Sequence, residues 1–205
     1  LILLYPLYLI LLLNEKYFST GFKVVRFQAK FILFCIGIIR KEHGRFPADG
    51  KTYIICSNHS SYLDILLLYA SIPNYFIFLG KKELGNVPLF SIFFKKMNIL
   101  IDRGNPKSSH VSINKAIHEM GKGRSVVIFP EGTIPSSAPE MRAFKNGAFK
   151  VALDNNIPIL PISFPDNYKC LEDKWNMEAK SGPGIVNIHF HEPIDVIQKD
   201  NPDLI

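Results

Sequence analysis

The sequence predicts an α/β protein with a mostly parallel central sheet flanked by helices, preceded by an N-terminal hydrophobic helical segment. From about residue 44 onward, short apolar runs rich in β-branched and aromatic residues alternate with stretches of helical length. Such alternation is typical of a parallel sheet covered by helices. Before that point the chain is apolar with basic edges. We therefore divide the 205 residues into a segment over 1–43 and one α/β domain over 44–205.

The first element, residues 1–43, is expected to be a membrane-docking helical segment. Its opening run "LILLYPLYLILLL" is nearly unbroken in apolar residues, and as a helix it would measure about 20 Å against a hydrocarbon core of about 30 Å. A second apolar run, 31–39, lies between Lys30 and Arg40. Short apolar segments with basic edges are typical of helices that lie in a membrane surface. Two ordinary core helices are the alternative.

The elements of the α/β domain follow in alternation. The predicted strands are apolar runs bounded by Gly, Pro, Asn or charged residues, and they cover 51–57, 74–80, 98–102, 124–130, 157–164 and 184–191. The predicted helices have helical length or apolar spacing, and they cover 62–71, 87–97, 108–123 and 144–156. The chain contains no internal repeat or long linker that would divide this domain further.

Composition and charge narrow the class of partner. A formal charge of +6 suits an anionic partner, and 47% hydrophobic residues favour a lipid surface over nucleic acid. No Lys/Arg-aromatic pattern of a nucleic-acid motif is present, and 20% charged residues exclude a polytopic membrane protein. The three cysteines lack the spacing of a disulfide framework or a zinc site. We expect a membrane-associated protein on the cytoplasmic face.

A histidine and an aspartate follow the first predicted strand of the domain. Ligands of open α/β sheets bind beyond the carboxyl ends of the strands. On one regular helix, His59 and Asp64 would point about 140° apart, so they meet only if His59 precedes the helix and Asp64 lies in its first turns. Asp64 could then accept from one imidazole nitrogen and leave the other as a base. The alternative is an ordinary helix start with His59 merely exposed.

Three further strand ends carry polar groups. Arg103 follows the strand at 98–102, where an arginine can bind a phosphate or a carboxylate through two hydrogen bonds. The loop "FPEGT" offers Glu131 and Thr133 around Gly132, whose missing side chain allows close approach of a ligand. Lys145 begins the last predicted helix. An ordinary turn is the alternative for Arg103 and for the "FPEGT" loop.

The blocks "NHSSYLD", "ILIDRG", "FPEGT" and "ILPISF" together resemble, in order, the four blocks of the glycerolipid acyltransferase family. "GKKELGNVPLF" and "FKNGAF" are similar to segments between those blocks, and the likeness runs from about residue 44 to 195. The resemblance implies transfer of an acyl chain to a lipid hydroxyl. It is greatest to members that acylate the sn-2 hydroxyl of 1-acyl-glycerol-3-phosphate, which gives phosphatidic acid for phospholipid synthesis.

The resemblance also implies roles for single residues. His59 would deprotonate the acceptor hydroxyl while Asp64 orients and supports the imidazolium. The hydroxyl would attack the thioester of acyl-CoA or acyl-carrier protein directly, so neither an acyl-enzyme, a metal nor a cofactor is implied. Arg103 would bind the acceptor phosphate. Further substrate-binding positions matching the family are Glu131, Gly132, Thr133, Lys81, Lys82 and Lys145.

One departure from the family pattern leaves the acceptor open. The family often has an arginine after "FPEGT", where this chain has Ile134. Arg142 or Lys145 could replace that charge, or the acceptor could be another lysolipid, such as a lyso-ornithine lipid. Two other classes are a hydrolase that uses Cys56 with His59 and a non-catalytic lipid-binding protein.

Overall fold

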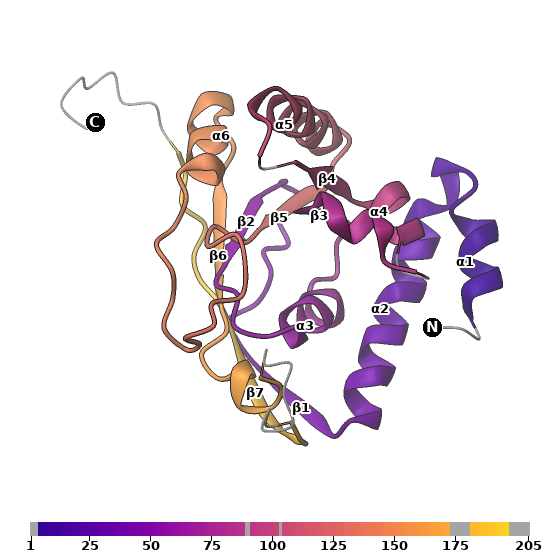
Figure 1. Ribbon diagram of the computed structural model, residues 1–205, viewed down its shortest axis with the longest axis vertical. Helices are drawn as coiled ribbons and strands as arrows, with labels where there is room; N and C mark the ends of the chain where they lie inside the picture. Colours follow the sequence, from indigo (N-terminus) through magenta and orange to yellow (C-terminus); the bar gives the residue numbers. More distant parts are fainter. Residues whose placement is uncertain (1–3, 89–90, 103, 173–180, 197–205) are drawn as a thin grey trace.

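The computed structural model describes residues 4–88, 91–102, 104–172 and 181–196 (Figure 1). Within these ranges the sheet has seven strands in the order β1-β7-β6-β2-β5-β3-β4. The strands are β1 (Ile38–His43), β2 (Ile54–Ser57), β3 (Phe76–Lys81), β4 (Ile99–Ile101), β5 (Ser125–Ile128), β6 (Ile159–Ser163) and β7 (Gly184–Phe190). All neighbouring pairs are parallel except β6 and β7. The predicted α/β class with a mostly parallel sheet is confirmed.

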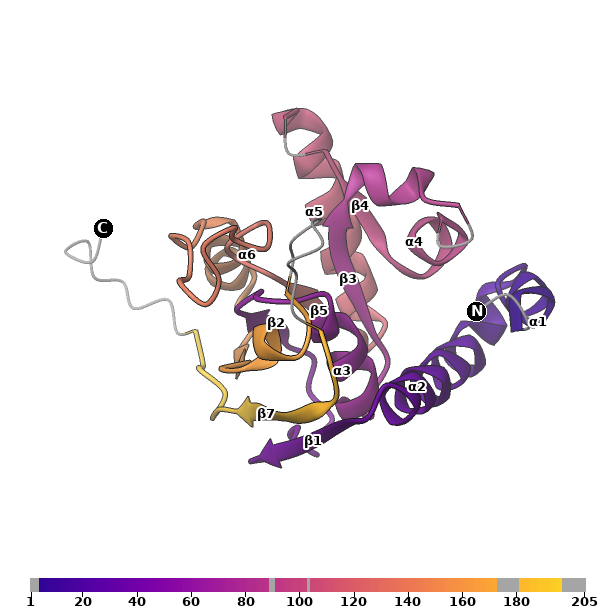
Figure 2. The same ribbon diagram turned by 60° about the horizontal axis from the view of Figure 1, so that its bottom comes forward.

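Helices cover both faces of this sheet. The α-helices are α1 (Tyr5–Leu11), α2 (Phe18–Cys35), α3 (Leu63–Ser71), α4 (Ser91–Met97), α5 (Pro106–Gly121) and α6 (Gly147–Asn155). Short 3-10 helices are η2 (Glu15–Tyr17), η3 (Lys82–Asn86) and η4 (Asn167–Lys169). Figure 2 shows α2 and α3 on the opposite side of the sheet from α6.

The strands are apolar at successive positions because both of their faces are buried. On β2, Ile55 belongs to the core cluster shared with α1 to α4, whereas Ile54 and Cys56 belong to the cluster shared with α5 and α6. On β5, Val127 and Val126 divide in the same way. The sheet is therefore the middle of three layers, and its parallel strands end together at one edge.

Local sequence explains where the outer helices begin and end. Asn105 caps α5, since its side-chain oxygen accepts from the backbone N–H groups of Lys107 and Ser108. Pro106 fits the first turn, where no N–H partner is needed. At the other end of the domain, α6 stops at Asn156, whose φ of 53° is left-handed.

The segment before residue 44 differs from the predicted pair of helices. The apolar run 31–39 is divided, because α2 ends at Cys35 and β1 begins at Ile38. Gly37 makes this break with a φ of +71°, and a Cβ there would lie 2.7 Å from Pro183 Cβ. β1 then pairs with β7 over its whole length. Residues 38–43 are thus a strand of the sheet that the sequence did not predict.

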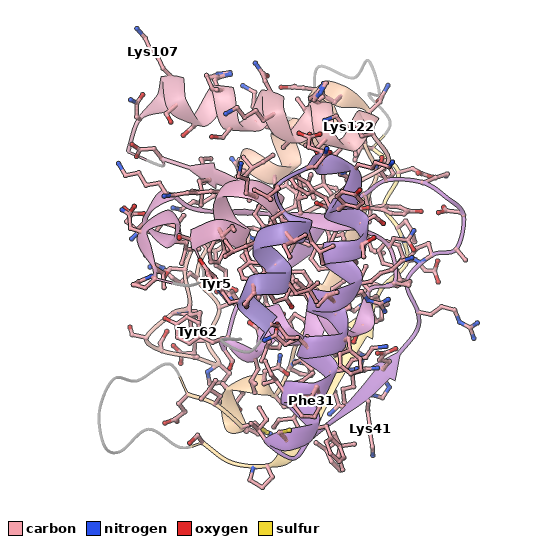
Figure 3. All side chains as sticks on the ribbon, turned by 90° about the vertical axis from the view of Figure 1, so that its right-hand side faces the viewer. Tyr5, Phe31, Lys41, Tyr62, Lys107 and Lys122 are labelled. Atoms are coloured by element: carbon pink, nitrogen blue, oxygen red, sulfur yellow. The ribbon has the colours of Figure 1, made fainter. Side chains whose placement is uncertain are left out.

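Helices α1 and α2 lie side by side over one face of the molecule (Figure 3). Their inward side chains, among them Tyr8, Phe22 and Leu33, are buried in the core, while Phe27 and Phe34 are exposed. The hydroxyl of Tyr8 donates to Gln28 and joins the two helices. Among the described residues, no helix is both long and apolar enough to cross a membrane.

Candidate active site

The turn from β2 into α3 brings His59 and Asp64 together. His59 lies in the loop two residues after β2, and Asp64 is in the first turn of α3. The distance between His59 Nδ1 and Asp64 Oδ2 is 2.9 Å. Asp64 is completely buried, whereas 14% of the His59 side chain is exposed. This is the loop-to-helix arrangement that the spacing requires for a contact.

Four donors surround the carboxylate of Asp64. Oδ2 accepts from the backbone N–H groups of Ser60 at 2.8 Å and Ser61 at 3.1 Å, in addition to His59. Oδ1 accepts from the side-chain amide of Asn167 at 2.7 Å. An ionised carboxylate is the form that accepts all four bonds. With Nδ1 of His59 donating to this carboxylate, the neutral imidazole has its lone pair on Nε2, as a general base needs.

The loop after β5 holds the imidazole from a second direction. The ring of His59 stacks on Phe129, with 3.9 Å between centroids and 15° between planes. Glu131 is buried, and its two oxygens accept from the backbone N–H groups of His59 at 2.8 Å and Arg142 at 2.9 Å. Glu131 therefore ties the His59 loop to the loop before α6, which is different from direct contact with a substrate.

A cavity of about 480 Å³ opens beside His59. Its walls come from α2, α3, β3, α4 and the loop after β5. Most are apolar, including Val25, Ala29, Ile32, Ile65, Leu66, Leu79, Leu84, Phe93 and Phe94. An apolar cavity with a few polar groups at one end is the usual form of a site for a lipid-like molecule.

The structure brings four further residues of the sequence analysis to this cavity. Lys81, Gly132, Thr133 and Ile134 line it together with His59. Gly132 has a φ of +81°, a left-handed conformation that favours glycine. Ile134 is buried in the wall, so an apolar side chain stands where the family pattern often has a cation.

Other predicted substrate-binding residues lie elsewhere. Lys82 Nζ lies 2.6 Å from Asp102 Oδ2, and this hydrogen bond holds the pKa of Asp102 below its usual value. Lys145 is exposed, and its backbone N–H donates to Pro130. Among the described residues, neither Lys82 nor Lys145 lines the cavity. Arg103 lies outside the described residues.

Cys56 points away from the base. It packs in the core cluster of α5 and α6, on the other face of the sheet. Burial raises the pKa of its thiol to about 12, so the thiol stays protonated near neutral pH. This placement disfavours the hydrolase that would use Cys56 with His59.

Within the described ranges, no three His, Cys, Asp or Glu side chains gather as metal ligands.

Sequence reasoning did not assign a role to Phe129 or Asn167. Phe129 is part of "FPEGT", and an aromatic residue at a strand end is the signal that could have raised it as a ring support. Asn167 follows β6 by four positions and lies far from Asp64 in the chain. Its neighbours carry no pattern that would have identified it.

A three-layer α/β fold with a His–Asp pair at the mouth of an apolar cavity has the features of an enzyme that acts on lipid-like molecules. The chain belongs to the acyltransferase family, because the family model described as Acyltransferase matches residues 39–165. The four sequence blocks all lie within that range.

Known relatives agree with this membership. The chain is 31% identical to 1-acyl-sn-glycerol-3-phosphate acyltransferase of Salmonella typhimurium over 161 residues, which are 76% of this chain and 63% of that protein. It is also 31% identical to the protein of the same name in Helicobacter pylori, over 77% of this chain and 66% of the relative. The chain thus spans about two thirds of the length of these relatives.

A solved structure shares the fold. The crystal structure of the 1-acyl-sn-glycerophosphate (LPA) acyltransferase PlsC from Thermotoga maritima superposes with a TM-score of 0.73 at 22% identity. The match covers 92% of this chain and 74% of that one. The mostly parallel sheet with flanking helices is therefore a fold that also occurs in this solved structure.

Proposed function

We propose that this protein transfers an acyl chain from a thioester donor to the sn-2 hydroxyl of 1-acyl-glycerol-3-phosphate, giving phosphatidic acid. The observation that carries the proposal is the His59–Asp64 pair at the mouth of the apolar cavity. Family membership supports the reaction, and the names of the relatives support the acceptor. Acyl-CoA or acyl-carrier protein is the donor class, and no cofactor is needed.

The reaction is a single displacement. Nε2 of His59 takes the proton of the acceptor hydroxyl as its oxygen attacks the thioester carbon. Asp64 holds the ring from its other nitrogen, Nδ1, and stabilises the imidazolium that forms. The imidazolium returns the proton to the departing thiolate, which leaves as the free thiol. The apolar cavity beside His59 offers room for an acyl chain.

The acceptor phosphate would meet the cationic side of the site. Lys81 and Thr133 are polar residues of the cavity wall. Arg103 is proposed for the phosphate from its place in "ILIDRG", two positions after the last residue of β4 in the sequence. Glu131 contributes by fixing the loop that carries His59, and Gly132 by leaving room in the wall.

A direct assay tests the proposal. Purified protein is mixed with oleoyl-CoA and 1-oleoyl-glycerol-3-phosphate, the release of free thiol is followed, and the lipid product is identified by mass spectrometry. We expect thiol release that depends on the acceptor, with phosphatidic acid as the product. Thiol release without acceptor, at an equal rate, would indicate a thioesterase instead. Binding of both lipids without any turnover would favour the non-catalytic lipid-binding protein.

A second acceptor class is favoured by one observation. Ile134 is buried in the cavity wall, which places an apolar group where a phosphate-binding arginine often stands in the family. A lysophospholipid with a different head group, or a lyso-ornithine lipid, is the alternative acceptor. The same assay with a panel of head groups separates these acceptors, since each would be ranked by kcat/KM.

We also propose that the protein works on the cytoplasmic face of a membrane. The exposed side chains Phe27, Phe31 and Phe34 follow one another at helical spacing on α2. Lys23 and Lys30 are exposed on the same helix. An amphipathic face of this kind suits the boundary between lipid head groups and acyl chains. Docking there would bring the cavity, whose wall includes α2, close to its lipid substrates.

A further inference from the structure

Asn167 is a buried polar residue that reaches the His–Asp pair from outside the four sequence blocks. It is the first residue of η4, after β6, and its side chain is completely inaccessible to solvent. Its amide Nδ2 donates to Asp64 Oδ1 at 2.7 Å, across 103 positions of sequence. Both partners are fully buried, so water does not compete for this bond.

The two oxygens of Asp64 are held by different parts of the fold. Oδ2 receives its three bonds from His59, Ser60 and Ser61, all in the loop that precedes Asp64. Oδ1 receives its bond from Asn167 on the other side of the carboxylate. Rotation about the Cβ–Cγ bond moves both oxygens, so hydrogen bonds to both oxygens restrict it more than hydrogen bonds to one of them. The second anchor fixes the plane of the group and keeps Oδ2 directed at Nδ1 of the imidazole.

A polar side chain at position 167 lowers the stability of the folded protein. The hydrogen bond to Asp64 gives a reason for an amide there. Its carbonyl oxygen Oδ1 is buried and has no hydrogen-bond partner among the described residues. A buried acceptor without a partner is unfavourable, and an apolar side chain would avoid it. The amide is oriented with its N–H group toward the carboxylate, because the reverse orientation would place two oxygens against each other.

The backbone holds Asn167 in place for this contact. The backbone carbonyl of Asn167 accepts from the backbone N–H groups of Cys170 and Leu171 at 3.0 and 3.2 Å, which closes the η4 turn. The carbonyl of Leu171 in turn accepts from Ser61 Oγ at 2.8 Å. The η4 turn and the His59 loop are therefore joined at two points, one at Asp64 and one at Ser61.

We infer that Asn167 is a positioning residue for acyl transfer, which acts on His59 through Asp64. This inference rests on the proposed function. Loss of its N–H group leaves Asp64 free to turn away from Nδ1, so the imidazole loses its preferred tautomer and its support during proton transfer. Neither Asn167 nor Asp64 is among the residues that line the cavity. The effect therefore belongs to kcat and not to KM.

The substitution Asn167→Ala tests the inference, with Asp166→Ala as the matched control. Asp166 precedes Asn167 and binds the backbone and side chain of Asn187 at 2.9 and 2.6 Å, without touching Asp64. Its removal loosens the same turn from β7. We expect Asn167→Ala to lower kcat at least tenfold with KM changed less than twofold, and Asp166→Ala to keep kcat within threefold. Equal losses of kcat in both variants would mean a structural role and overturn the inference.

A double-mutant cycle shows whether Asn167 acts through Asp64. In an Asp64→Asn background, adding Asn167→Ala should change the remaining rate less than twofold, because the group that it orients is already disabled. A further tenfold loss there would overturn the inference. Asn167→Ser, whose hydroxyl can still donate, should recover part of kcat, and it also provides a folded variant if the alanine protein does not fold. Failure of the proposed function is distinguishable, since the wild-type protein itself would then show no acyl transfer.

Discussion

At the scale of single residues, the site depends on one imidazole held from three sides. Asp64 fixes Nδ1, Phe129 stacks on the ring, and Glu131 binds the backbone N–H of His59. None of these contacts uses Nε2, and His59 lines the cavity. The roles of the residues can therefore be separated by substitutions that remove one contact at a time.

Removal of the base should abolish most of the turnover. Because proton transfer by a positioned base contributes about 10²–10⁴-fold, His59→Ala should lower kcat at least about 10²-fold. Asp64→Asn should also lose rate, since an amide neither fixes the tautomer nor supports the imidazolium. Steady-state thiol release measures both, and His110→Ala on the exposed face of α5 is the control. A His59→Ala protein that kept more than a tenth of the wild-type rate would show that the base lies elsewhere.

The thiol of Cys56 should be inert. Its pKa of about 12 leaves it protonated at pH 8, and it is buried, whereas Cys35 is exposed. Iodoacetamide at pH 8 should label Cys35 in the folded protein and reach Cys56 only in urea, as peptide mass spectrometry would show. Cys56→Ala should remain active. An acyl adduct on Cys56 during turnover would instead place the Cys hydrolase first.

Arg103 should bind the charged head group of the acceptor, and substitution of Ile134 should change how well a phosphate acceptor is used. A charge-assisted contact is worth about 1.5–3 kcal/mol, so Arg103→Ala should lower kcat/KM for lysophosphatidate at least tenfold. Arg103→Lys should recover part of it, because an ammonium lacks the planar fork. Ile134→Arg should improve use of the phosphate acceptor, with Ile134→Met as the control for volume. Unchanged kinetics in Arg103→Ala, with a zwitterionic acceptor preferred, would exclude the phosphatidate-forming assignment while leaving acyl transfer intact.

At the scale of elements, the site is assembled where loops after β2, β5 and β6 meet at one edge of the sheet. β2 lies between β5 and β6 and is parallel to both, so the three loops leave in the same direction. Asn58 joins two of them, because its side chain both donates to and accepts from the backbone of Phe164. Glu131 joins the His59 loop to the loop before α6.

The junction made by Glu131 should be sensitive to the loss of one oxygen. In Glu131→Gln, the new NH₂ group must face one of two backbone N–H donors, so one hydrogen bond is lost and two donors oppose each other. A loss of about 2 kcal/mol corresponds to a Tm lower by about 4–8 °C in a domain of this size, and kcat should fall as His59 shifts. Calorimetry and thiol release measure the two effects. Glu140→Gln, an exposed carboxylate in the same loop, should change neither.

The local sequence pattern was sufficient to predict the strands with two buried faces, but it was insufficient to predict the edge strand β1. β2, β3, β5 and β6 are apolar at successive positions, which is the pattern of a buried parallel strand. β1 could not be recognised, because Ile38 and Ile39 continue the apolar run of α2 and the rest of the strand is charged. The distinguishing feature is the left-handed backbone at Gly37, where an added Cβ would lie 2.7 Å from Pro183 Cβ.

The candidate site divides in the same way. His59 and Asp64 are near in sequence and flanked by clear strand and helix patterns, so their contact could be predicted from the spacing together with those patterns. The bond from Asn167 to Asp64 depends on how β6 lies beside β2 in the sheet. The buried position of Glu131 depends likewise on tertiary packing. Residue type suggested a ligand contact there, and the fold uses the carboxylate for backbone N–H groups instead.

At the scale of the whole molecule, the protein combines a net positive charge with exposed apolar side chains on α2. The chain carries a formal charge of +6, and α1 and α2 form one face, on which Figure 3 labels Tyr5 and Phe31. Deleting the first 40 residues would not test a docking role, because it would remove the first half of β1 and expose the core that Phe22 and Leu33 cover. Substitutions on the exposed side of α2 leave that core in place.

The triple substitution Phe27→Ser, Phe31→Ser and Phe34→Ser should weaken binding to vesicles of phosphatidylglycerol and phosphatidylcholine at least tenfold. Full burial of one large apolar side chain is worth about 1.5–3 kcal/mol, so partial insertion of three is enough for that loss. Val111, Met141 and Leu153 are exposed apolar residues outside α2, and serine at these three positions is the control. Binding of the wild-type protein should also weaken between 0.1 and 1 M salt, as the screening length falls from about 10 to 3 Å.

Vesicle sedimentation measures the affinity for the membrane. A short-chain micellar acceptor separates docking from chemistry, because kcat on this acceptor should stay within twofold in the triple variant. Equal vesicle affinity of the wild type, the triple variant and the control would show that α2 does not enter the lipid.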